Sequence, residues 1–577
     1  MRVVFFAPHA GIWVHAFPEA LVADAVRASG AEVVYVTCGG ALGSCCIPMA
    51  SRGLTVASPE RAKQAVCRGC RRERLWLRHG FRFDGYDFES MLTGDDERRV
   101  EGLVAQARPE DVAAFEVDGV QVGRLALYEY LIARKKSQLE LTDAEWPEFR
   151  PRLSNALRSL LAAGKVLERE RADRVVTYNS LYSVNAMWRA AADQRGIPSY
   201  FLHAGVGLER RLQTLIIGRD STLRWYLRLI EAWSRYRDVP CSKHDLAVVT
   251  GHFEHLFRGT SVFAYSSAKA SHDVRQRFGI RPDQKLVVAT MSSYDEYIAA
   301  AAIGEMPAEA GTLFPTQIEW IHALVEWFRA RPELFLVIRV HPREFPNKRE
   351  GTKSDHAQRL ERELADLPAN VRVNWPADQL SIYDLAEYTD VFLNAWSSAG
   401  REMALLGIPV VAYCPELLLY PADLNYVGTT HAAYFAAIET ALRDGWSFER
   451  VRKAYRWCVL ELVHGVANIG DGYHFTEEPP RSLWQRGLRA ALALPGVREP
   501  LDLVRRPRRL REQDRLAHAI TSGRETLLDL HQKVDEAAET AALRAQLARL
   551  ARALYPSERG APAAGTLRQR LAAVVDS

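Results

Sequence analysis

Residues 394–402, Asn-Ala-Trp-Ser-Ser-Ala-Gly-Arg-Glu, carry the densest set of groups that could hold an anion. The pattern predicts a strand, a turn at Ser397 and Ser398, and a helix with Ser398 as its N-cap. Hydroxyl groups and the free N–H groups of a helix start would then face one negatively charged ligand. Gly400 would allow close approach, and Glu402 would accept hydrogen bonds from hydroxyl groups of the ligand. The alternative for Glu402 is a carboxylate that only stabilises the first helical turn.

Two further polar segments follow apolar runs in the same half of the chain. One reads Arg-Val-His-Pro-Arg-Glu from Arg339 onward, and the proline after His341 favours an extended turn that aims the imidazole across the strand end. The other is the pair Ser292 and Ser293. Because the carboxyl ends of parallel strands meet at one edge of a sheet, all three segments are predicted to surround one site, where Arg339 and Arg343 would supply positive charge.

An alternation of strands and helices, typical of parallel α/β domains, must position these segments. In the second half the predicted strands are 286–290, 334–340, 371–374, 391–394 and 409–413, and the predicted helices are 316–329, 354–366, 381–388 and 398–406. In the first half, strands at 2–7 and 32–37 flank a helix at 16–29, and strands at 174–177 and 199–203 flank a helix at 186–195. Two mainly parallel sheets are therefore predicted.

The length of the chain requires several domains. With 577 residues, of which 48% are hydrophobic and 25% charged, it is too long for one core and globular in composition. We predict an N-terminal domain at 1–245, with a cysteine-rich segment and a charged, mostly helical insertion between residues 71 and 168. A second α/β domain is predicted at 246–480, followed by a basic helical tail at 481–577.

The tail contains two patterns that each have two interpretations. Leu543, Leu547, Leu550 and Leu554 are spaced for a short coiled coil that would form a homodimer, or for an amphipathic helix packed on the body of the protein. Residues 505–511, Arg-Arg-Pro-Arg-Arg-Leu-Arg, are either a solvated turn or a contact for anionic lipid headgroups.

Five of the eight cysteines lie between residues 38 and 70 of the first domain. Cys67 and Cys70 form a C-x-x-C pair, and two of Cys38, Cys45 and Cys46 could complete a tetrahedral zinc site, with Cys38 and Cys46 as the preferred partners. The competing interpretation is that the upstream cysteines are small buried residues. Four thiolates would leave no open coordination position, so such a zinc ion would be structural and not catalytic.

Other features exclude several classes of protein. The formal net charge is only +4, and no concentrated basic face with stacking aromatic residues is visible, so no nucleic acid is expected as a partner. No apolar run reaches the roughly 18 to 20 residues that span a bilayer, and the apolar start is too short for a signal peptide. We therefore expect a cytoplasmic protein whose membrane contact would be peripheral, on the inner face of the cytoplasmic membrane.

From residue 286 to about residue 415 the chain resembles the donor domain of GT-B glycosyltransferases that build bacterial capsule and surface polysaccharides, including Kdo transferases and sialyltransferases with "HP" and "SS" motifs. His341 and the proline after it match the first motif, and Ser397 and Ser398 match the second. The resemblance implies a GT-B fold, in which a cleft separates two Rossmann-like domains. It also implies a CMP-sugar donor, Kdo or sialic-acid-like, held by these His and Ser side chains, and a surface polysaccharide or lipid-linked glycan as acceptor. The pattern after Ser398 is shared with GT-B enzymes that use other nucleotide sugars, so those donors stay open.

The catalytic base is predicted on loops of the first half. The sialyltransferase-like enzymes carry it in a carboxylate-carboxylate-Gly motif, of which Asp118 before Gly119 is only a partial match. His9, and His203 with Glu209, follow predicted strands, and a histidine of near-neutral pKa could take the proton of the acceptor hydroxyl. Each could equally be a structural loop residue. No Asp-x-Asp follows a strand, so neither a metal ion nor another cofactor is expected in catalysis.

Two alternative functions stay open. A transferase that moves glycerol phosphate from a CDP-alcohol would show a similar His-Pro pair and Ser-rich turn. A catalytically inactive GT-B scaffold that binds partners through its C-terminal helix is the second alternative. The presence of His341, Ser397 and Glu402 argues against the scaffold.

Overall fold

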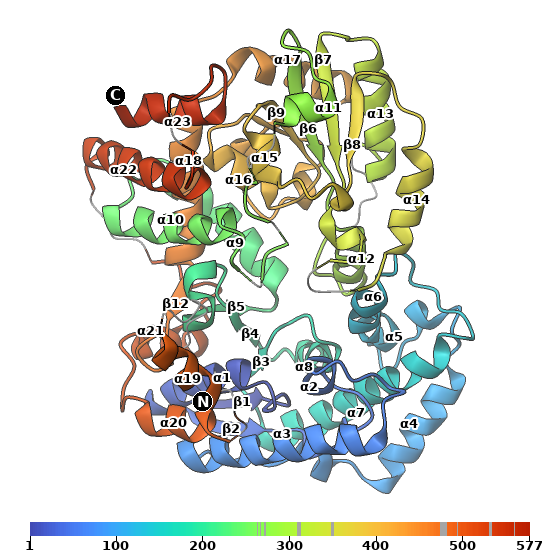
Figure 1. Cartoon of the computed structure of the whole chain (residues 1–577). Coiled ribbons are helices and arrows are strands. Elements are labelled where there is room, and N and C mark those ends of the chain that lie inside the picture. The colour runs from blue at the N-terminus through green and yellow to red at the C-terminus, as the bar shows by residue number, and fades with distance from the viewer. Residues whose placement is uncertain are drawn as a thin grey trace.

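The structure is a computed structural model that describes residues 1–576 except 262, 266, 271, 272, 308–312, 348–350, 474–481, 493, 495, 530–533 and 559. In Figure 1 two six-stranded sheets stand one above the other, the N-terminal sheet in the lower half and the C-terminal sheet in the upper half. Helices cover both. The predicted α/β class, with two Rossmann-like domains and a helical C-terminal extension, is confirmed.

The upper sheet is entirely parallel. Its strands are β6 (Lys285–Thr290), β7 (Leu334–Arg339), β8 (Val371–Asn374), β9 (Thr389–Asn394), β10 (Val410–Ala412) and β11 (Tyr426–Val427), and they lie in the order β8-β7-β6-β9-β10-β11. The chain runs outward from β6 in one direction and, after a crossover, from β9 in the other. The carboxyl ends of β6 and β9 thus form the switch point at which open α/β sheets bind ligands.

The lower sheet has the order β2-β1-β3-β4-β5-β12 and its own switch point between β1 and β3. Its strands are β1 (Arg2–Phe6), β2 (Glu32–Val36), β3 (Arg174–Tyr178), β4 (Ser199–Ala204), β5 (Thr214–Arg219) and β12 (Val466–Asn468). The first four are parallel, whereas β5 and β12 are antiparallel to their neighbours. The strand β12 comes from far downstream, so the chain crosses back from the upper half to the lower.

Alternating side chains of the lower sheet bury two separate cores. Val3 and Phe5 pack toward helices on one face, and Val4 and Phe6 pack toward helices on the other. The lower helices are α1 (Trp13–Ala28), α2 (Ile47–Ala50), α3 (Glu60–Phe81), α4 (Gly94–Gln106), α5 (Val122–Ala126), α6 (Tyr128–Arg134), α7 (Trp146–Glu170) and α8 (Ser183–Asp193). The segment predicted as a helical insertion thus supplies the second half of α3, all of α4 to α6 and most of α7, and the helices α4 to α7 contribute side chains to the second core.

The upper sheet is covered in the same way. Two helices, α9 (Thr222–Tyr236) and α10 (Lys243–Phe257), lead to it from the lower half. The helices that follow are α11 (Val274–Phe278), α12 (Tyr294–Ala302), α13 (Gln317–Arg329), α14 (Asp355–Glu363), α15 (Ile382–Ala386), α16 (Ala399–Leu405), α17 (His431–Asp444) and α18 (Phe448–Val459).

The C-terminal extension folds onto both halves. Its helices are α19 (Leu483–Leu492), α20 (Arg498–Arg505), α21 (Gln513–Thr521), α22 (Glu536–Leu554) and α23 (Leu567–Asp576). The four leucines of α22 are fully buried in the core that α10 also enters, through residues such as Phe253. They are therefore not the exposed seam of a dimer, and the interpretation as a helix packed on the body is correct. None of the helices described here is long and apolar enough to cross a membrane.

Candidate functional site

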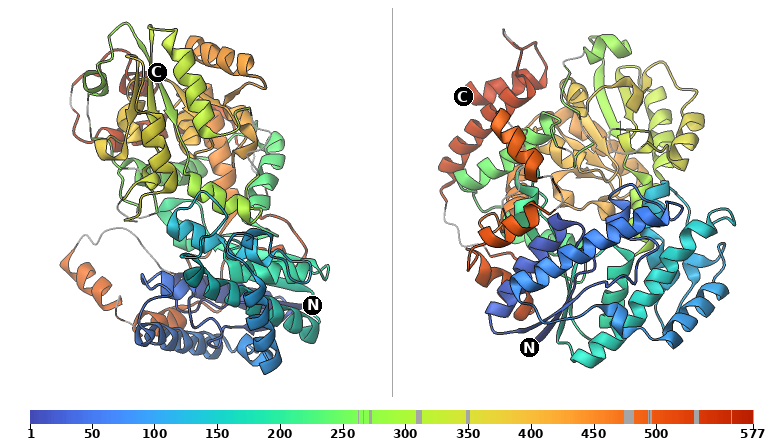
Figure 2. Two further views of the ribbon diagram at one scale, coloured as in Figure 1. Left: turned by 90° about the vertical axis from the view of Figure 1, so that its right-hand side faces the viewer. Right: turned by 60° about the horizontal axis from the view of Figure 1, so that its bottom comes forward.

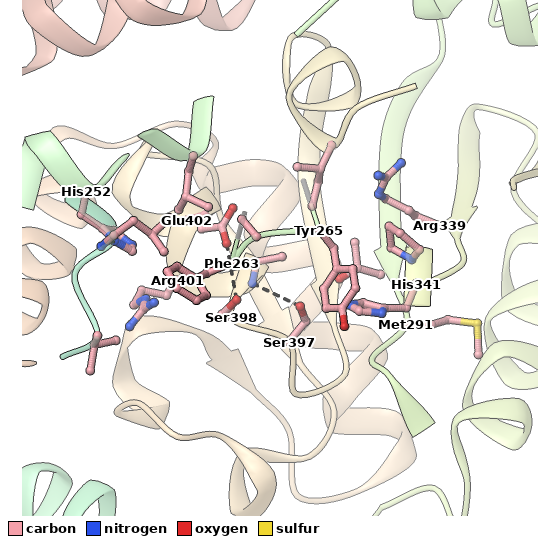
Figure 3. A pocket seen from close by; sticks show the side chains of 18 of the residues that line it. His252, Phe263, Tyr265, Met291, Arg339, His341, Ser397, Ser398, Arg401 and Glu402 are labelled. Carbon is pink, nitrogen blue, oxygen red and sulfur yellow. Dashed lines mark hydrogen bonds between the residues drawn. The ribbon is translucent and has the colours of Figure 1, made fainter. Parts of the chain in front are cut away.

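A cavity of about 310 Å³ lies between the two halves, at the carboxyl ends of β6, β7 and β9. Its position coincides with the switch point of the upper sheet. Side chains of the upper half that line it include Arg339, His341, Ser397, Ser398, Arg401 and Glu402, and those contributed by the rest of the chain include Arg211, His252, Phe263 and Tyr265. In Figure 3, Arg339 and His341 flank one side, Arg401 and His252 flank the other, and the two serines lie between them.

The turn after β9 brings Ser397, Ser398 and Glu402 together as predicted, but the two serines form different hydrogen bonds from those that the sequence suggested. Ser398 already has helical backbone angles, so its side chain is not the cap; its hydroxyl donates to Glu402 Oε1 at 3.4 Å. Instead, Ser397 Oγ accepts the N–H of Ala399 at 3.2 Å. Tyr383 donates to the other oxygen of Glu402 at 2.9 Å, and burial raises the pKa of this carboxyl.

Gly400 is required by the protein itself and not by a ligand. A Cβ atom at this position would lie 2.3 Å from the Tyr420 hydroxyl and 2.5 Å from Asn394 Nδ2. Asn394 in turn donates to Ser397 O at 2.9 Å, so the glycine lets the strand end and the turn pack closely. The expected close approach therefore exists, between two parts of the chain.

Arg339 and His341 both line the cavity. The guanidinium of Arg339 donates to Leu380 O at 2.9 Å and also to the Asn374 side chain, and burial lowers its pKa to about 10. His341 Nδ1 accepts the backbone N–H of Arg343 at 3.3 Å, which assigns the ring proton to Nε2. Burial, with repulsion from the neighbouring arginines, lowers the pKa of His341 to about 3. His341 is thus a neutral ring that offers one N–H donor.

Ser292, Ser293 and Arg343 are not among the side chains that line the cavity. Ser292 Oγ accepts the N–H of Trp396 at 3.1 Å, and Ser293 Oγ donates to Asp295 Oδ1 at 2.9 Å. Arg343 forms a buried ion pair with Asp295 at 2.9 Å. All three side chains stabilise strand ends and turns. The sequence had instead predicted that they contact the nucleotide-sugar donor.

Two donors that the sequence analysis missed line the same cavity. His252 Nδ1 accepts the N–H of Leu208 at 3.0 Å, so the ring proton is on Nε2, which is buried and has no partner among the described residues. Arg401 pairs with Glu461 through Nη1, and its Nε–H is likewise buried without a partner there. Arg401 stood inside the segment that the sequence singled out, whereas His252 lies in the middle of α10, where no motif marks it.

The polar groups of the cavity are mainly donors. Three guanidinium groups, Arg211, Arg339 and Arg401, face one carboxylate of the lining, Glu402, and two neutral imidazoles add N–H donors. Buried N–H groups without partners are costly, and native proteins rarely leave them so. An anionic ligand with several acceptor oxygens would satisfy them.

None of the four predicted catalytic residues lines this cavity. His203 is the last residue but one of β4, and its Nδ1 lies 2.9 Å from Ala204 O. Burial, followed by the charge of Arg211, lowers its pKa to about 4. Glu209 is exposed, in the turn that precedes β5.

Asp118 lies at the other end of the lower sheet. Its carboxylate pairs with Arg99 at 2.8 Å, and its carbonyl accepts a hydrogen bond from Gln194, which directly follows α8. Because α8 begins at the carboxyl end of β3, its last turn is far from the strand ends that face the cavity. His9 does lie at a strand end of the lower sheet, but in a second, separate cavity.

Several cysteines of the first domain lie close together, but in their present positions the described side chains are not arranged as a metal site. Cys38, Cys67 and Cys70 line one small cavity, and Cys46 lies near enough to Cys38 and Cys70 for their charges to interact. Cys45 lines the cavity that contains His9. Burial raises the pKa of Cys38 to about 11 and that of Cys70 to about 12. Within the described residues, no group of three or more His, Cys, Asp or Glu side chains is arranged to hold a metal ion.

No family model matches the chain, and no curated protein matches its sequence. Among solved structures, the β-Kdo 2,4 transferase KpsC of Thermosulfurimonas dismutans is 16% identical, over 50% of this chain and 80% of that chain, with a TM-score of 0.31. The UDP-GlcNAc 2-epimerase of Neisseria meningitidis, solved with UDP-GlcNAc, is 12% identical over 79% of this chain and 98% of that chain, with a TM-score of 0.25. The calicheamicin glycosyltransferase CalG4 is 14% identical over 80% and 94%, with a TM-score of 0.25. At these identities and TM-scores, the similarities carry no argument about the activity of this chain.

Proposed function

We propose that the chain is a glycosyltransferase whose cavity between the two sheets holds a nucleotide-activated sugar. The proposal rests on one observation: the arginines, neutral histidines and serine hydroxyls that line this cavity converge at the switch point of the upper sheet. Two of these donors, His252 Nε2 and Arg401 Nε, are buried and lack a partner among the described residues. A phosphate ester supplies the acceptor oxygens and the negative charge that such a site lacks.

In the proposed reaction the acceptor oxygen bonds to the anomeric carbon while the bond from that carbon to the phosphate oxygen breaks. The electron pair leaves with the nucleoside phosphate, so negative charge grows on the phosphate oxygens. Arg339, Arg401 and the N–H of His341 are the groups that would stabilise this charge, which is why we propose catalysis without a bound metal ion. A base of the protein would take the acceptor proton.

We propose a CMP-sugar as the preferred donor and a surface or lipid-linked glycan as the acceptor, on the match of His341 and Ser397-Ser398 to the sequence motifs described above. Other nucleotide sugars would also satisfy the donors of the cavity. Transfer of glycerol phosphate from CDP-glycerol is the second candidate, because the same groups would hold its diphosphate. Release of CMP from a CMP-sugar, measured beside release of CMP from CDP-glycerol, separates the two reactions.

The nucleotide site is tested by calorimetric titration with CMP, CDP, UDP, GDP and dTDP. We expect at least one of them to bind, and His341→Ala to weaken it by about 1 to 3 kcal/mol, as for the loss of a charge-assisted hydrogen bond. His356→Ala is the matched control, because His356 is also a buried imidazole of the upper half but does not line the cavity. Equal affinities of the His341 and His356 variants would remove His341 from the site, and no binding of any nucleotide would refute the proposal.

We also propose that the enzyme works at an anionic membrane surface, to which α19 would bind. Leu483, Trp484 and Leu488 of α19 are exposed, the first two by 82% and 74%, and Figure 2 (left) shows this helix standing away from the lower half. Exposed apolar side chains of this size on one helix are rare in soluble proteins. Arg486 on α19 and Arg505 at the end of α20 are exposed as well, and basic side chains beside Trp and Leu suit an interfacial helix.

Two arginines of the basic cluster at 505–511 have partners within the protein, whereas Arg505, Arg508 and Arg511 are exposed. Arg506 donates to Gly80 O at 2.5 Å and covers the ring of Phe81, and Arg509 pairs with Asp514 at 2.5 Å. These side chains therefore attach the extension to the lower half or to itself. The apolar residues of α19, which the sequence analysis passed over, carry the membrane proposal instead.

A further inference from the structure

A second cavity, of about 90 Å³, lies in the lower half and is lined by His9, Glu129, Asn155 and Ser183. His9 follows β1, and Ser183 is the first residue of the helix that follows β3. The cavity thus occupies the switch point of the lower sheet, between the carboxyl ends of β1 and β3, which is where an open α/β sheet binds its ligands.

Several side chains that line this cavity carry buried polar atoms without partners among the described residues. Neither ring nitrogen of His9 has a hydrogen-bond partner among the described residues, and the same holds for Glu129 Oε2 and Asn155 Oδ1. All these atoms are buried, and the side chains of His9 and Asn155 are only 5% and 3% exposed. Buried polar groups in native proteins nearly always have a partner, so four such atoms on one cavity indicate a bound molecule or ordered water.

The hydrogen bonds that these side chains do make show which of their unpartnered atoms are donors and which are acceptors. Glu129 Oε1 accepts both the N–H and the hydroxyl of Ser183, at 2.8 and 3.1 Å. Asn155 Nδ2 donates to Cys45 O at 2.7 Å. The free atoms of Glu129 and Asn155 are therefore acceptors, while the neutral ring of His9 offers one donor and one acceptor. A ligand for this cavity needs several groups that donate and accept, which is the property of hydroxyl groups.

The remaining walls are mostly apolar, with Leu42, Ile47, Leu54 and Val184 among them, and Thr55 and Arg152 add two polar side chains. A sugar ring has C–H faces and a rim of hydroxyl groups, and thus matches both parts of the lining. We propose that this cavity binds one sugar residue of the acceptor glycan, an inference that rests on the proposed glycosyltransferase function. Glu129 and Asn155 hold its hydroxyl groups as positioning residues.

Side-chain contacts connect the two cavities. The ring of His9 packs edge-on against the ring of Tyr182, with 5.3 Å between the ring centroids. Tyr128 lies close enough to Tyr182 and to Arg343 for electrostatic interactions with both side chains. Arg343 donates to the hydroxyl of Tyr265, which lines the nucleotide cavity, at 2.8 Å. The two cavities are thus separate, and a subsite beyond the reacting sugar fits an acceptor that is a polysaccharide.

The experiment blocks the mouth of the cavity. Ala133 on α6 lines it and is exposed, so Ala133→Trp fills the entrance without disturbing a core. Ala65→Trp is the matched control, because Ala65 is an exposed alanine on α3 that does not line the cavity. The probes are the methyl glycosides of a hexose, an N-acetylhexosamine and a hexuronic acid, and binding is followed by saturation-transfer NMR on the full-length protein.

We expect at least one methyl glycoside to bind the wild type and the Ala65 variant equally, and to lose its signal in Ala133→Trp. Glu129→Gln, which keeps both contacts to Ser183 and turns the free acceptor into a donor, is expected to weaken binding about tenfold, as for one lost hydrogen bond. Glycoside binding that is unchanged in both variants, or absent from the wild type, overturns the proposal and leaves ordered water in the cavity. The affinity for CMP is measured beside it and is expected to be unchanged in all variants, so a failure of the nucleotide site is seen separately.

Discussion

Arg343 and Asp295 form an ion pair at 2.9 Å in which the two side chains are only 2% and 1% exposed. The same guanidinium donates to Ile132 O of α6 at 3.1 Å, so a pair that belongs to the upper half also binds the lower half. A second link runs from the lower half to the upper half: Lys135, which directly follows α6, donates from Nζ to Arg343 O at 2.5 Å and to Thr352 O at 2.7 Å. This group of contacts joins the two halves beside the cavity that Arg339 and His341 line.

We expect Arg343→Met to destabilise the protein by about 3 to 5 kcal/mol, because Asp295 would remain buried without its counter-charge. Adding Asp295→Leu should restore much of this loss, because the pair is then replaced by apolar side chains of similar size. Urea unfolding of the two single variants and the double variant measures the effect.

The nucleotide affinity of the folded Arg343→Met protein distinguishes this role from a direct contact. Since Arg343 does not line the cavity, CMP should bind within about threefold of the wild type, well below the tenfold change that 1.4 kcal/mol represents. A loss of CMP affinity as large as that in His341→Ala would place Arg343 in the donor site, as the sequence analysis predicted.

Glu344 makes the stability of the protein depend on pH. It accepts the N–H of Tyr294 at 2.9 Å, and burial raises its pKa from the usual 4.5 to about 7. Between these values the folded protein binds more protons than the unfolded chain, so its free energy of unfolding falls as the pH rises from about 4.5 to about 7, and this contribution is constant above that.

Glu344→Gln carries no charge at any pH. The variant should therefore gain stability relative to the wild type as the pH rises through this window, by up to about 3 kcal/mol, at about 1.4 kcal/mol per pKa unit. Urea unfolding at pH 5, 6, 7 and 8 measures the difference, and Glu333→Gln at an exposed position is the control. A difference that does not change with pH would show that Glu344 is ionised throughout.

The sequence predicted the parallel strands well, because each is a short apolar run that ends in a polar turn. The upper strands at 334–340 and 371–374 match β7 and β8 to within a residue. The antiparallel strands were missed for a physical reason: β5 directly follows the turn after β4, and β12 has three residues whose partner is 250 positions away. Such pairing is decided by tertiary contact and not by local pattern.

The same limit applies to the site. His341, Ser397 and Ser398 could be predicted because they follow strand ends, where topology brings loops together, and Glu402 because it stands in the first turns of the helix that begins there. His252 could not be found, because it reaches the cavity from the middle of a helix in another part of the chain. Side chains such as Ser292 stand at a strand end too, but turn toward a neighbouring loop, and the sequence does not show which way a side chain points.

The cysteines lead to a prediction that metal analysis can check. Cys38, Cys67 and Cys70 share one small cavity, and Cys46 lies near Cys38 and Cys70. We propose that these side chains rearrange to bind a zinc ion as four thiolates. We expect about one zinc ion per chain in protein prepared without chelator, and a loss of that zinc in Cys70→Ser. Because burial raises the pKa values of these thiols, zinc binding would release protons and weaken as the pH falls. Zinc-free wild-type protein would return the four cysteines to the role of small buried residues.

The last prediction concerns the membrane contact of α19. We expect the full-length protein to sediment with vesicles that contain an anionic lipid at low ionic strength. Binding should weaken as salt shortens the Debye length from about 10 Å at 0.1 M to about 3 Å at 1 M, because the exposed arginines contribute roughly 1 kcal/mol each through charge. Replacing both Leu483 and Trp484 by Ser should abolish sedimentation even at low salt, because the apolar contact is then lost. Val427→Ser, at an exposed apolar position on β11 in the other half, should bind like the wild type. If the double variant sediments like the wild type, α19 is not the membrane contact, and the exposed Leu and Trp side chains must serve another partner.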